Sequence, residues 1–167
     1  MHALSTVYRA YGLDAGEERL RWRLGVDTKA VFWKSDTTGS LHPDMAMVLA
    51  QDYFDVKPID LLADDSWDRA LAFAASGHPI VLLIATRESG AMHWVVAVGS
   101  EEPGRLTVYD PLFDEPYTED AAFWDSHVLT AWAIRPNLSG KRLPSWTAHQ
   151  RGASDMVGAA KRFKSIK

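Results

Sequence analysis

Residues 91–124, "AMHWVVAVGSEEPGRLTVYDPLFDEPYTEDAAFW", decide the fold of this 167-residue chain. Two apolar segments flank the turn residues "EEPG", a pattern that predicts a β-hairpin. His93 opens the first strand and Asp110 follows the second. Because hairpin strands are antiparallel, the start of the first lies beside the end of the second. We therefore expect both side chains at one edge of the sheet, where a carboxylate can orient an imidazole.

Each of these two residues also has an ordinary structural explanation. A lone histidine in an apolar strand is commonly a core residue, and Asp110-Pro111 is a frequent start of a turn. Because the hairpin brings His93 and Asp110 together, its geometry favours a catalytic pair over two separate structural roles. Such a pair serves a nucleophile, yet the chain contains no cysteine. The missing cysteine also excludes disulfides, zinc–thiolate sites and thiol catalysis within these 167 residues.

The remainder of the chain predicts helices first and strands afterwards. Apolar spacing and caps predict helices over residues 3–11, 14–24, 41–54 and 66–77, with Asp14 and Ser66 as caps, and a helical turn over 118–124 capped by Thr118. Short β-rich segments follow at residues 78–86, 92–99, 105–110 and 129–136, and residues 55–59 form a possible further strand. This order predicts an α+β fold in which N-terminal helices pack on an antiparallel meander.

Composition narrows the class of protein. Apolar residues make up 47% and charged residues 24% of the chain, which is typical of a globular domain. No apolar run approaches the roughly 18 residues of a membrane span. The net charge of −4 argues against general nucleic-acid binding. We expect one domain over residues 1–136, a basic and partly mobile extension over 137–167, and a cytoplasmic location.

Five segments resemble the C39-like peptidases, which are papain-like cysteine peptidases that include the leader-trimming domains of bacteriocin exporters. The most specific is the strand "HWVVAVG" followed by "LTVYDP"; the others are "YRAYGLDAGEERLRWRLGVD", "GHPIVLLI" and "EDAAFW". The resemblance covers residues 1–136 and implies a papain-like fold and a peptide or protein substrate. It implies that His93 is the general base and Asp110 its orienting partner, with no cofactor.

The chain departs from this family at its first helix. In the family a cysteine opens that helix and a glutamine lies just upstream, which places the nucleophile at or immediately before Met1. Independently, the helix over residues 3–11 has no N-cap candidate and is apolar around most of its circumference. Three explanations follow: a peptide-binding domain that is catalytically silent, a shortened form of an active peptidase, or a substitute nucleophile. Ser5 and Thr6 lie too far inside the helix to favour the last.

Two further residues belong to the expected site. Trp94 neighbours His93 on its strand, and its ring could line a peptide groove. His2 lies at the end of the first helix that should face the pair, and we expect it in the same groove. His2, His93 and Asp110 could also form a metal site of two imidazoles and a carboxylate. We favour the simpler prediction, in which His2 is a polar residue near the chain end and no metal is bound.

Overall fold

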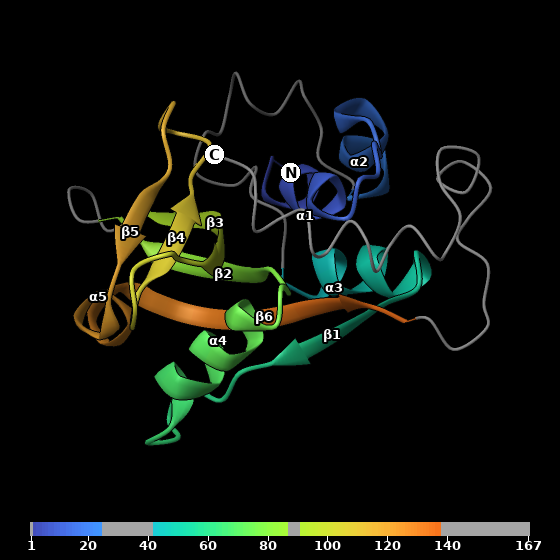
Figure 1. The fold of residues 1–167 in the computed structure, drawn as a ribbon. Coiled ribbons are helices and arrows are strands. Elements are labelled where there is room, and N and C mark those ends of the chain that lie inside the picture. The colour runs from blue at the N-terminus through green and yellow to red at the C-terminus, as the bar shows by residue number, and fades with distance from the viewer. Residues whose placement is uncertain (1, 25–41, 87–90, 138–167) are drawn as a thin grey trace.

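The centre of the fold is a six-stranded antiparallel sheet, seen in a computed structural model that describes residues 2–24, 42–86 and 91–137 (Figure 1). The strand order is β1-β6-β2-β3-β4-β5, and every neighbouring pair is antiparallel. The strands are β1 (Phe54–Pro58), β2 (Ile80–Ala85), β3 (Met92–Gly99), β4 (Leu106–Tyr109), β5 (Tyr117–Glu119) and β6 (Val128–Pro136).

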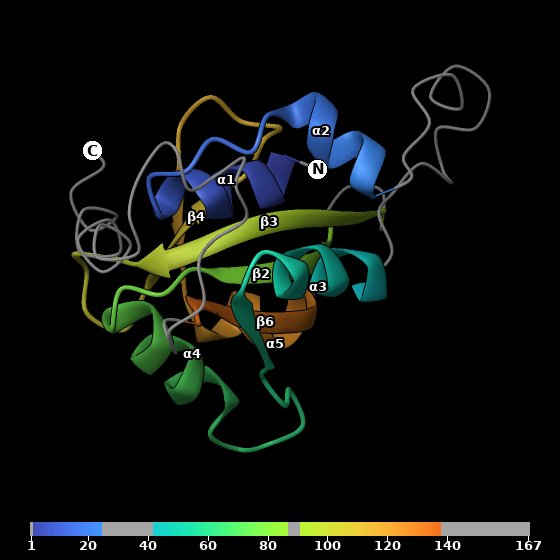
Figure 2. The ribbon, with the colours of Figure 1, turned by 90° about the vertical axis from the view of Figure 1, so that its right-hand side faces the viewer.

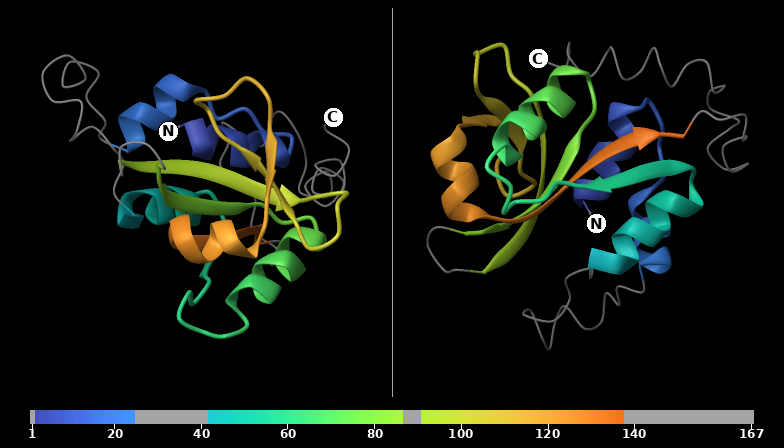
Figure 3. Two further views of the ribbon diagram at one scale, coloured as in Figure 1. Left: turned by 90° about the vertical axis from the view of Figure 1, so that its left-hand side faces the viewer. Right: turned by 90° about the horizontal axis from the view of Figure 1, so that it is seen from below.

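Helices cover both faces of this sheet. They are α1 (His2–Ala10), α2 (Glu17–Arg23), α3 (His42–Gln51), α4 (Ser66–Ala75) and α5 (Ala121–His127). Buried residues of α1, α2 and α3 join one hydrophobic cluster, and those of α4 and α5 join a second. Figure 2 shows α1 and α4 on opposite sides of the sheet, and Figure 3 shows the same layers from two other directions.

The alternation of side chains along each strand explains how one sheet packs against two hydrophobic clusters. In β3, Val96 and Val98 belong to the cluster beneath α1, whereas Val95 and Ala97 belong to the cluster beneath α4 and α5. Successive side chains of a strand point to opposite faces, so a strand covered on both sides must be apolar at nearly every position. This is why "IVLLIA" and "WVVAV" show no polar alternation.

The α+β class is confirmed, and β2 to β5 form a meander, but the last predicted strand does not continue it. The last strand, β6, lies between β1 and β2 and pairs with both. The N-terminal strand β1 is therefore an edge strand at the far side of the sheet from β4 and β5. This order depends on pairing between residues that are far apart in sequence, which local strand patterns do not report.

Three predicted helix caps are also wrong. Thr118 lies in β5, and the cap of α5 is Asp120, whose side chain accepts from the backbone N–H groups of Ala122 and Phe123 at 3.0 and 3.3 Å. Ser66 is already inside α4, and its hydroxyl accepts a hydrogen bond from the indole of Trp124 at 3.1 Å. In each case a tertiary contact or a neighbouring strand decides the boundary.

The third cap concerns the second helix. Asp14 lies outside α2 and accepts from the backbone N–H of Gly16 at 2.9 Å, while Gly16 itself is the residue that precedes the helix. Asp14 therefore closes a local turn before α2 and does not cap its first amide groups. The acidic residues Glu17 and Glu18 do occupy the first turn, as the helix dipole favours.

The proposed boundary at residue 136 stays a prediction. Of the basic extension over 137–167, only Asn137 belongs to the described residues; its backbone N–H donates to the carbonyl of Tyr53 at 2.7 Å and its side chain donates to Asp55 at 3.1 Å. Across the described ranges, no helix combines the length and apolarity that crossing a bilayer requires.

Candidate active site

His93 and Asp110 lie together at the open end of the hairpin formed by β3 and β4, away from its turn. His93 is the second residue of β3, so its imidazole lies at the start of that strand, and Asp110 directly follows β4. Nε2 of His93 lies 2.7 Å from Oδ1 of Asp110, so the predicted hydrogen bond is present. The Asp110 side chain is 4% exposed and that of His93 is 21% exposed. The carboxylate is therefore enclosed while part of the imidazole reaches the surface.

Three donors hold the Asp110 carboxylate. The backbone N–H of Leu112 donates to Oδ1 at 2.9 Å and the hydroxyl of Tyr117 donates to Oδ2 at 3.3 Å, in addition to His93. The carboxylate accepts these bonds, so the nitrogen of His93 that faces it is the donor and carries the hydrogen. In the neutral ring Nδ1 then has the free lone pair. No group among the described residues is hydrogen-bonded to Nδ1, so this nitrogen is available as a base.

The pair and α1 lie on different faces of the sheet. His93 is in phase with Val95, and Asp110 with Val108, and both valines belong to the cluster beneath α4 and α5. Helix α1 packs on β3 from the other face, although it begins toward the same end of the sheet as β3 (Figure 2). A nucleophile that precedes α1 must therefore approach the imidazole around that end of the sheet.

His2 and Trp94 contact residues other than His93 and Asp110. Nδ1 of His2 lies 3.1 Å from Oε1 of Glu17 at the start of α2, and both side chains are exposed. The ring of Trp94 lies 5.2 Å from that of Trp132 and packs against the cluster beneath α1. Their places in a peptide groove stay predictions. In the part of the chain that the structure describes, no three His, Cys, Asp or Glu side chains are grouped to hold a metal ion.

Ser5 and Thr6, the two residues considered as substitute nucleophiles, both lie within α1. Ser5 is 5% exposed on the packed face of α1. The hydroxyl of Thr6 donates to the backbone carbonyl of His2 at 3.1 Å, one turn earlier. These positions disfavour either residue as a substitute nucleophile.

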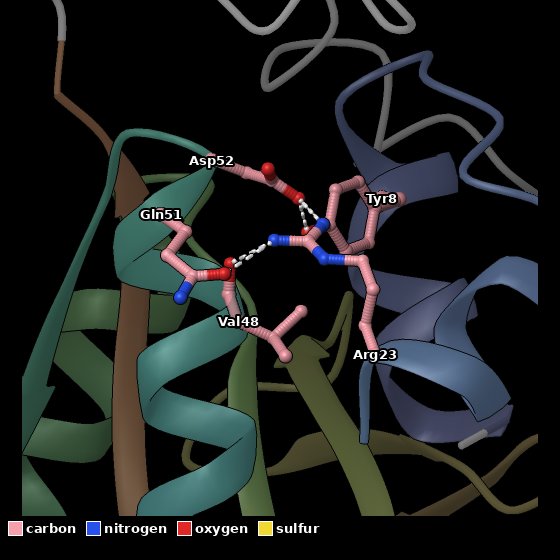
Figure 4. A network of polar contacts seen from close by, with 5 residues as sticks. All are labelled: Tyr8, Arg23, Val48, Gln51 and Asp52. Carbon is pink, nitrogen blue, oxygen red and sulfur yellow. Dashed lines mark hydrogen bonds and ion pairs between the residues drawn. The ribbon is translucent and has the colours of Figure 1, made fainter. Parts of the chain in front are cut away.

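A second polar cluster, centred on Asp52, was not predicted from the sequence (Figure 4). The hydroxyl of Tyr8 donates to Oδ2 of Asp52, and Nη1 of Arg23 donates to the same oxygen at 2.5 Å. Nη2 of Arg23 reaches the carbonyl of Val48 at 3.3 Å and the side chain of Gln51 at 3.0 Å. Burial, followed by the charge of Asp52, raises the pKa of Tyr8 far above its ordinary value. The cluster joins α1, α2 and the end of α3.

Tyr117 is the other residue that sequence patterns did not reveal. It lies seven positions beyond Asp110, in a three-residue strand whose existence was not predicted. The signal that could have found it is the turn chemistry of "DPLFDEPY", in which Asp-Pro and Glu-Pro bracket a loop that returns the chain to the end of β4.

Comparisons with known proteins agree with this fold. The peptidase domain of Streptococcus ComA, described as a bi-functional ABC transporter involved in a quorum sensing pathway, has a similar structure with a TM-score of 0.58. The match covers 80% of this chain and 88% of that domain at 16% sequence identity, and it shows a papain-like α+β fold. No curated protein matches the sequence. The sequence profile of the Peptidase_C39 like family matches residues 3–138, and the chain therefore belongs to that family.

Proposed function

We propose that this chain binds peptides beside His93 and Asp110 and does not cleave them. The observation that carries the proposal is a hydrogen-bonded imidazole–carboxylate pair, 2.7 Å apart, in a chain of 167 residues with no cysteine. Membership of a peptidase family supports a peptide as the ligand. The free nitrogen of His93 and the carboxylate of Asp110 can still bond a peptide amide and attract a positive charge.

The absence of cleavage follows from the missing nucleophile. A cysteine peptidase forms a covalent intermediate on its thiolate, and the imidazole takes up the thiol proton. Removing the nucleophile of such a set eliminates most of the rate, because the remaining members act only through it. His93 and Asp110 alone therefore do not hydrolyse a peptide at a measurable rate.

The test combines binding and turnover in the same sample. Imidazole resonances of His93, assigned by their loss in His93→Ala, are followed by NMR while a degenerate peptide mixture is added, and the mixture is then examined by mass spectrometry. The expected result is a shift of the His93 resonances with no new peptide termini. Hydrolysis that disappears in His93→Ala would disprove the silent domain, and unperturbed His93 resonances would disprove peptide binding at this site.

A second candidate function is cysteine-peptidase activity once a thiol is supplied. The specific observation in its favour is Nδ1 of His93, which has a free lone pair and no partner among the described residues. A thiol at the beginning of α1 would gain from the helix N-terminus, which stabilises thiolate. The family's upstream glutamine adds oxyanion stabilisation of about 3 kcal/mol.

This candidate is tested with chains that carry additional residues before Met1. One series places a cysteine at Met1 or at either of the two preceding positions, with a glutamine upstream, and matched chains carry serine in place of the cysteine. Hydrolysis by one member of the cysteine series and by none of the serine series supports the candidate. Inactivity of all members, in folded protein, contradicts it.

A further inference from the structure

The connection between β4 and β5 is exposed after Asp110. All six residues over 111–116 are exposed, including Leu112 at 67% and Phe113 at 63%. Large apolar side chains that remain in solvent close together are typical of an interaction surface. The ring of Phe113 contacts Tyr117 edge-on with centroids 5.7 Å apart, which leaves most of the ring uncovered. We call residues 111–116 the β4–β5 loop.

This loop is fastened to the carboxylate that holds His93. The N–H of Leu112 donates to the side chain of Asp110 at 2.9 Å, and the N–H of Phe113 donates to its backbone carbonyl at 3.0 Å. Two apolar side chains therefore begin within three residues of Asp110. The backbone of the loop and the imidazole of His93 thus bond the same oxygen of Asp110.

The segment that includes the loop is acidic, and Asp114 and Glu115 lie in the loop itself. Residues 110–120 contain five acids, namely Asp110, Asp114, Glu115, Glu119 and Asp120, and no lysine or arginine. Asp114 and Glu115 are exposed, and neither forms an ion pair with another described residue. Outside the loop, Nη2 of Arg105 lies 3.8 Å from Oδ2 of Asp120. A cationic ligand is attracted to this surface, and a second copy of the same loop is repelled.

We propose that the β4–β5 loop selects an extended peptide in which a large apolar residue stands next to a lysine or arginine. Leu112 and Phe113 contact the apolar side chain, and Asp114 and Glu115 bind the cation. The loop thereby places the peptide across His93. This inference rests on the proposed peptide-binding function and specifies which peptides the site accepts.

The experiment uses the full chain and three fluorescein-labelled hexapeptides of Gly and Ser that differ at two central positions. The test peptide carries Phe-Lys; one control carries Phe-Glu and the other Ser-Lys. Fluorescence anisotropy is expected to show that Phe-Lys binds at least about tenfold more tightly than either control. The preference over Phe-Glu should shrink at high salt, because exposed charges are screened.

Paired variants assign this preference to the loop. Leu112→Ser with Phe113→Ser should abolish the discrimination against Ser-Lys, and Asp114→Asn with Glu115→Gln should abolish that against Phe-Glu. Leu62→Ser and Glu101→Gln are the matched controls, since Leu62 is 94% exposed elsewhere and Glu101 is an exposed acid in the β3–β4 turn; both should bind like the unmodified chain.

Three results would overturn the inference. If the peptides shift the His93 resonances but the loop variants bind as the controls do, the loop has no selective role although the site does bind peptides. If no peptide shifts those resonances, the proposed function fails together with this inference. If Phe-Lys binds only after Lys161, Arg162, Lys164 and Lys167 are replaced by Gln, the occupant is the chain's own basic C-terminal segment.

Discussion

Asp52 and Asp110 are both buried carboxylates that directly follow a secondary-structure element, α3 in one case and β4 in the other. Asp52 receives hydrogen bonds from Tyr8 and Arg23, and Asp110 from His93, Tyr117 and a backbone amide. Arg23 also bonds the carbonyl of Val48 and the side chain of Gln51. The partner of Asp110 retains a nitrogen that bonds to no other described residue.

This difference separates a structural cluster from a chemical one. The guanidinium of Arg23 is charged at all ordinary pH values, so it cannot take up a proton, and its side chain is 12% exposed. The imidazole of His93 can change its protonation state, and its side chain is 21% exposed. Burial of a carboxylate is common to both clusters, whereas an accessible base belongs only to the second.

The largest expected effect comes from Arg23→Met, which breaks the structural cluster. It leaves Asp52 buried without its cation, and the loss of one partner of a buried ion pair costs about 3–5 kcal/mol of unfolding free energy. Urea denaturation measures it. Arg69→Met is the control, because the Arg69–Asp65 pair is 54% exposed on both sides and should contribute less than about 1 kcal/mol. Equal losses in the two variants would contradict the structural role of Asp52.

Asp110→Asn tests the chemical cluster in a cysteine-extended chain that hydrolyses peptide. An asparagine can turn its amide N–H toward Nε2, which moves the ring proton to Nδ1 and removes the base. The kcat should fall about 10²-fold or more, the size of general-base catalysis. Asp125→Asn, at an exposed position of α5, should leave kcat unchanged. An unchanged kcat in Asp110→Asn would remove Asp110 from the mechanism.

Tyr117→Phe should have a smaller effect on the same assay. Asp110 keeps its bonds to His93 and Leu112, and the lost bond is a long one of 3.3 Å. The unfolding free energy should fall by about 0.5–1.5 kcal/mol, and kcat should fall by less than in Asp110→Asn while KM stays constant. A kcat loss as large as that of Asp110→Asn would show that Tyr117 acts on the reaction more directly than as a positioning residue.

The smallest expected effect concerns His78, whose Nδ1 lies 3.3 Å from the hydroxyl of Tyr11. Burial, and then the charge of Arg135, lowers the pKa of His78 below its ordinary value. The unfolded chain therefore binds more protons than the folded one near pH 6, so stability falls as pH drops through the unfolded pKa of about 6.5. In His78→Gln this part of the decline should be absent when urea midpoints at pH 7.5 and 5.5 are compared. A parallel decline in both proteins would contradict the depressed pKa.

The features that could be predicted from the sequence are those formed by residues that lie close together in the chain. The hairpin around "EEPG" brings the start of β3 to the side of the sheet where β4 ends, because two strands and a short turn leave one simple arrangement; Val96 pairs with Tyr109 there, and His93 lies three residues before Val96. The apolar positions of residues 3–11 likewise identified α1, whose buried residues include Leu4, Val7 and Tyr8.

The features that sequence did not predict depend on distant partners. Arg23 and Asp52 are separated by 29 positions and Tyr8 and Asp52 by 44, so no short window contains the cluster. The place of β6 beside β1 depends on pairing between residues such as Phe54 and Pro136, which are 82 positions apart in sequence. His2 was expected near His93, and its imidazole contacts Glu17 because α2 packs against α1.

The central claim, that His93 held by Asp110 is a base ready to serve a thiol, is tested most directly by alkylation. The unmodified chain has no cysteine, so a cysteine placed before Met1 is the sole thiol in the reaction. We predict that iodoacetamide near pH 7 alkylates it at least about tenfold faster than N-acetylcysteine, since a helix N-terminus and an imidazole both favour thiolate. His93→Ala should reduce the rate to that of N-acetylcysteine. A thiol that reacts no faster than N-acetylcysteine, and equally in the presence and absence of His93, would contradict the claim.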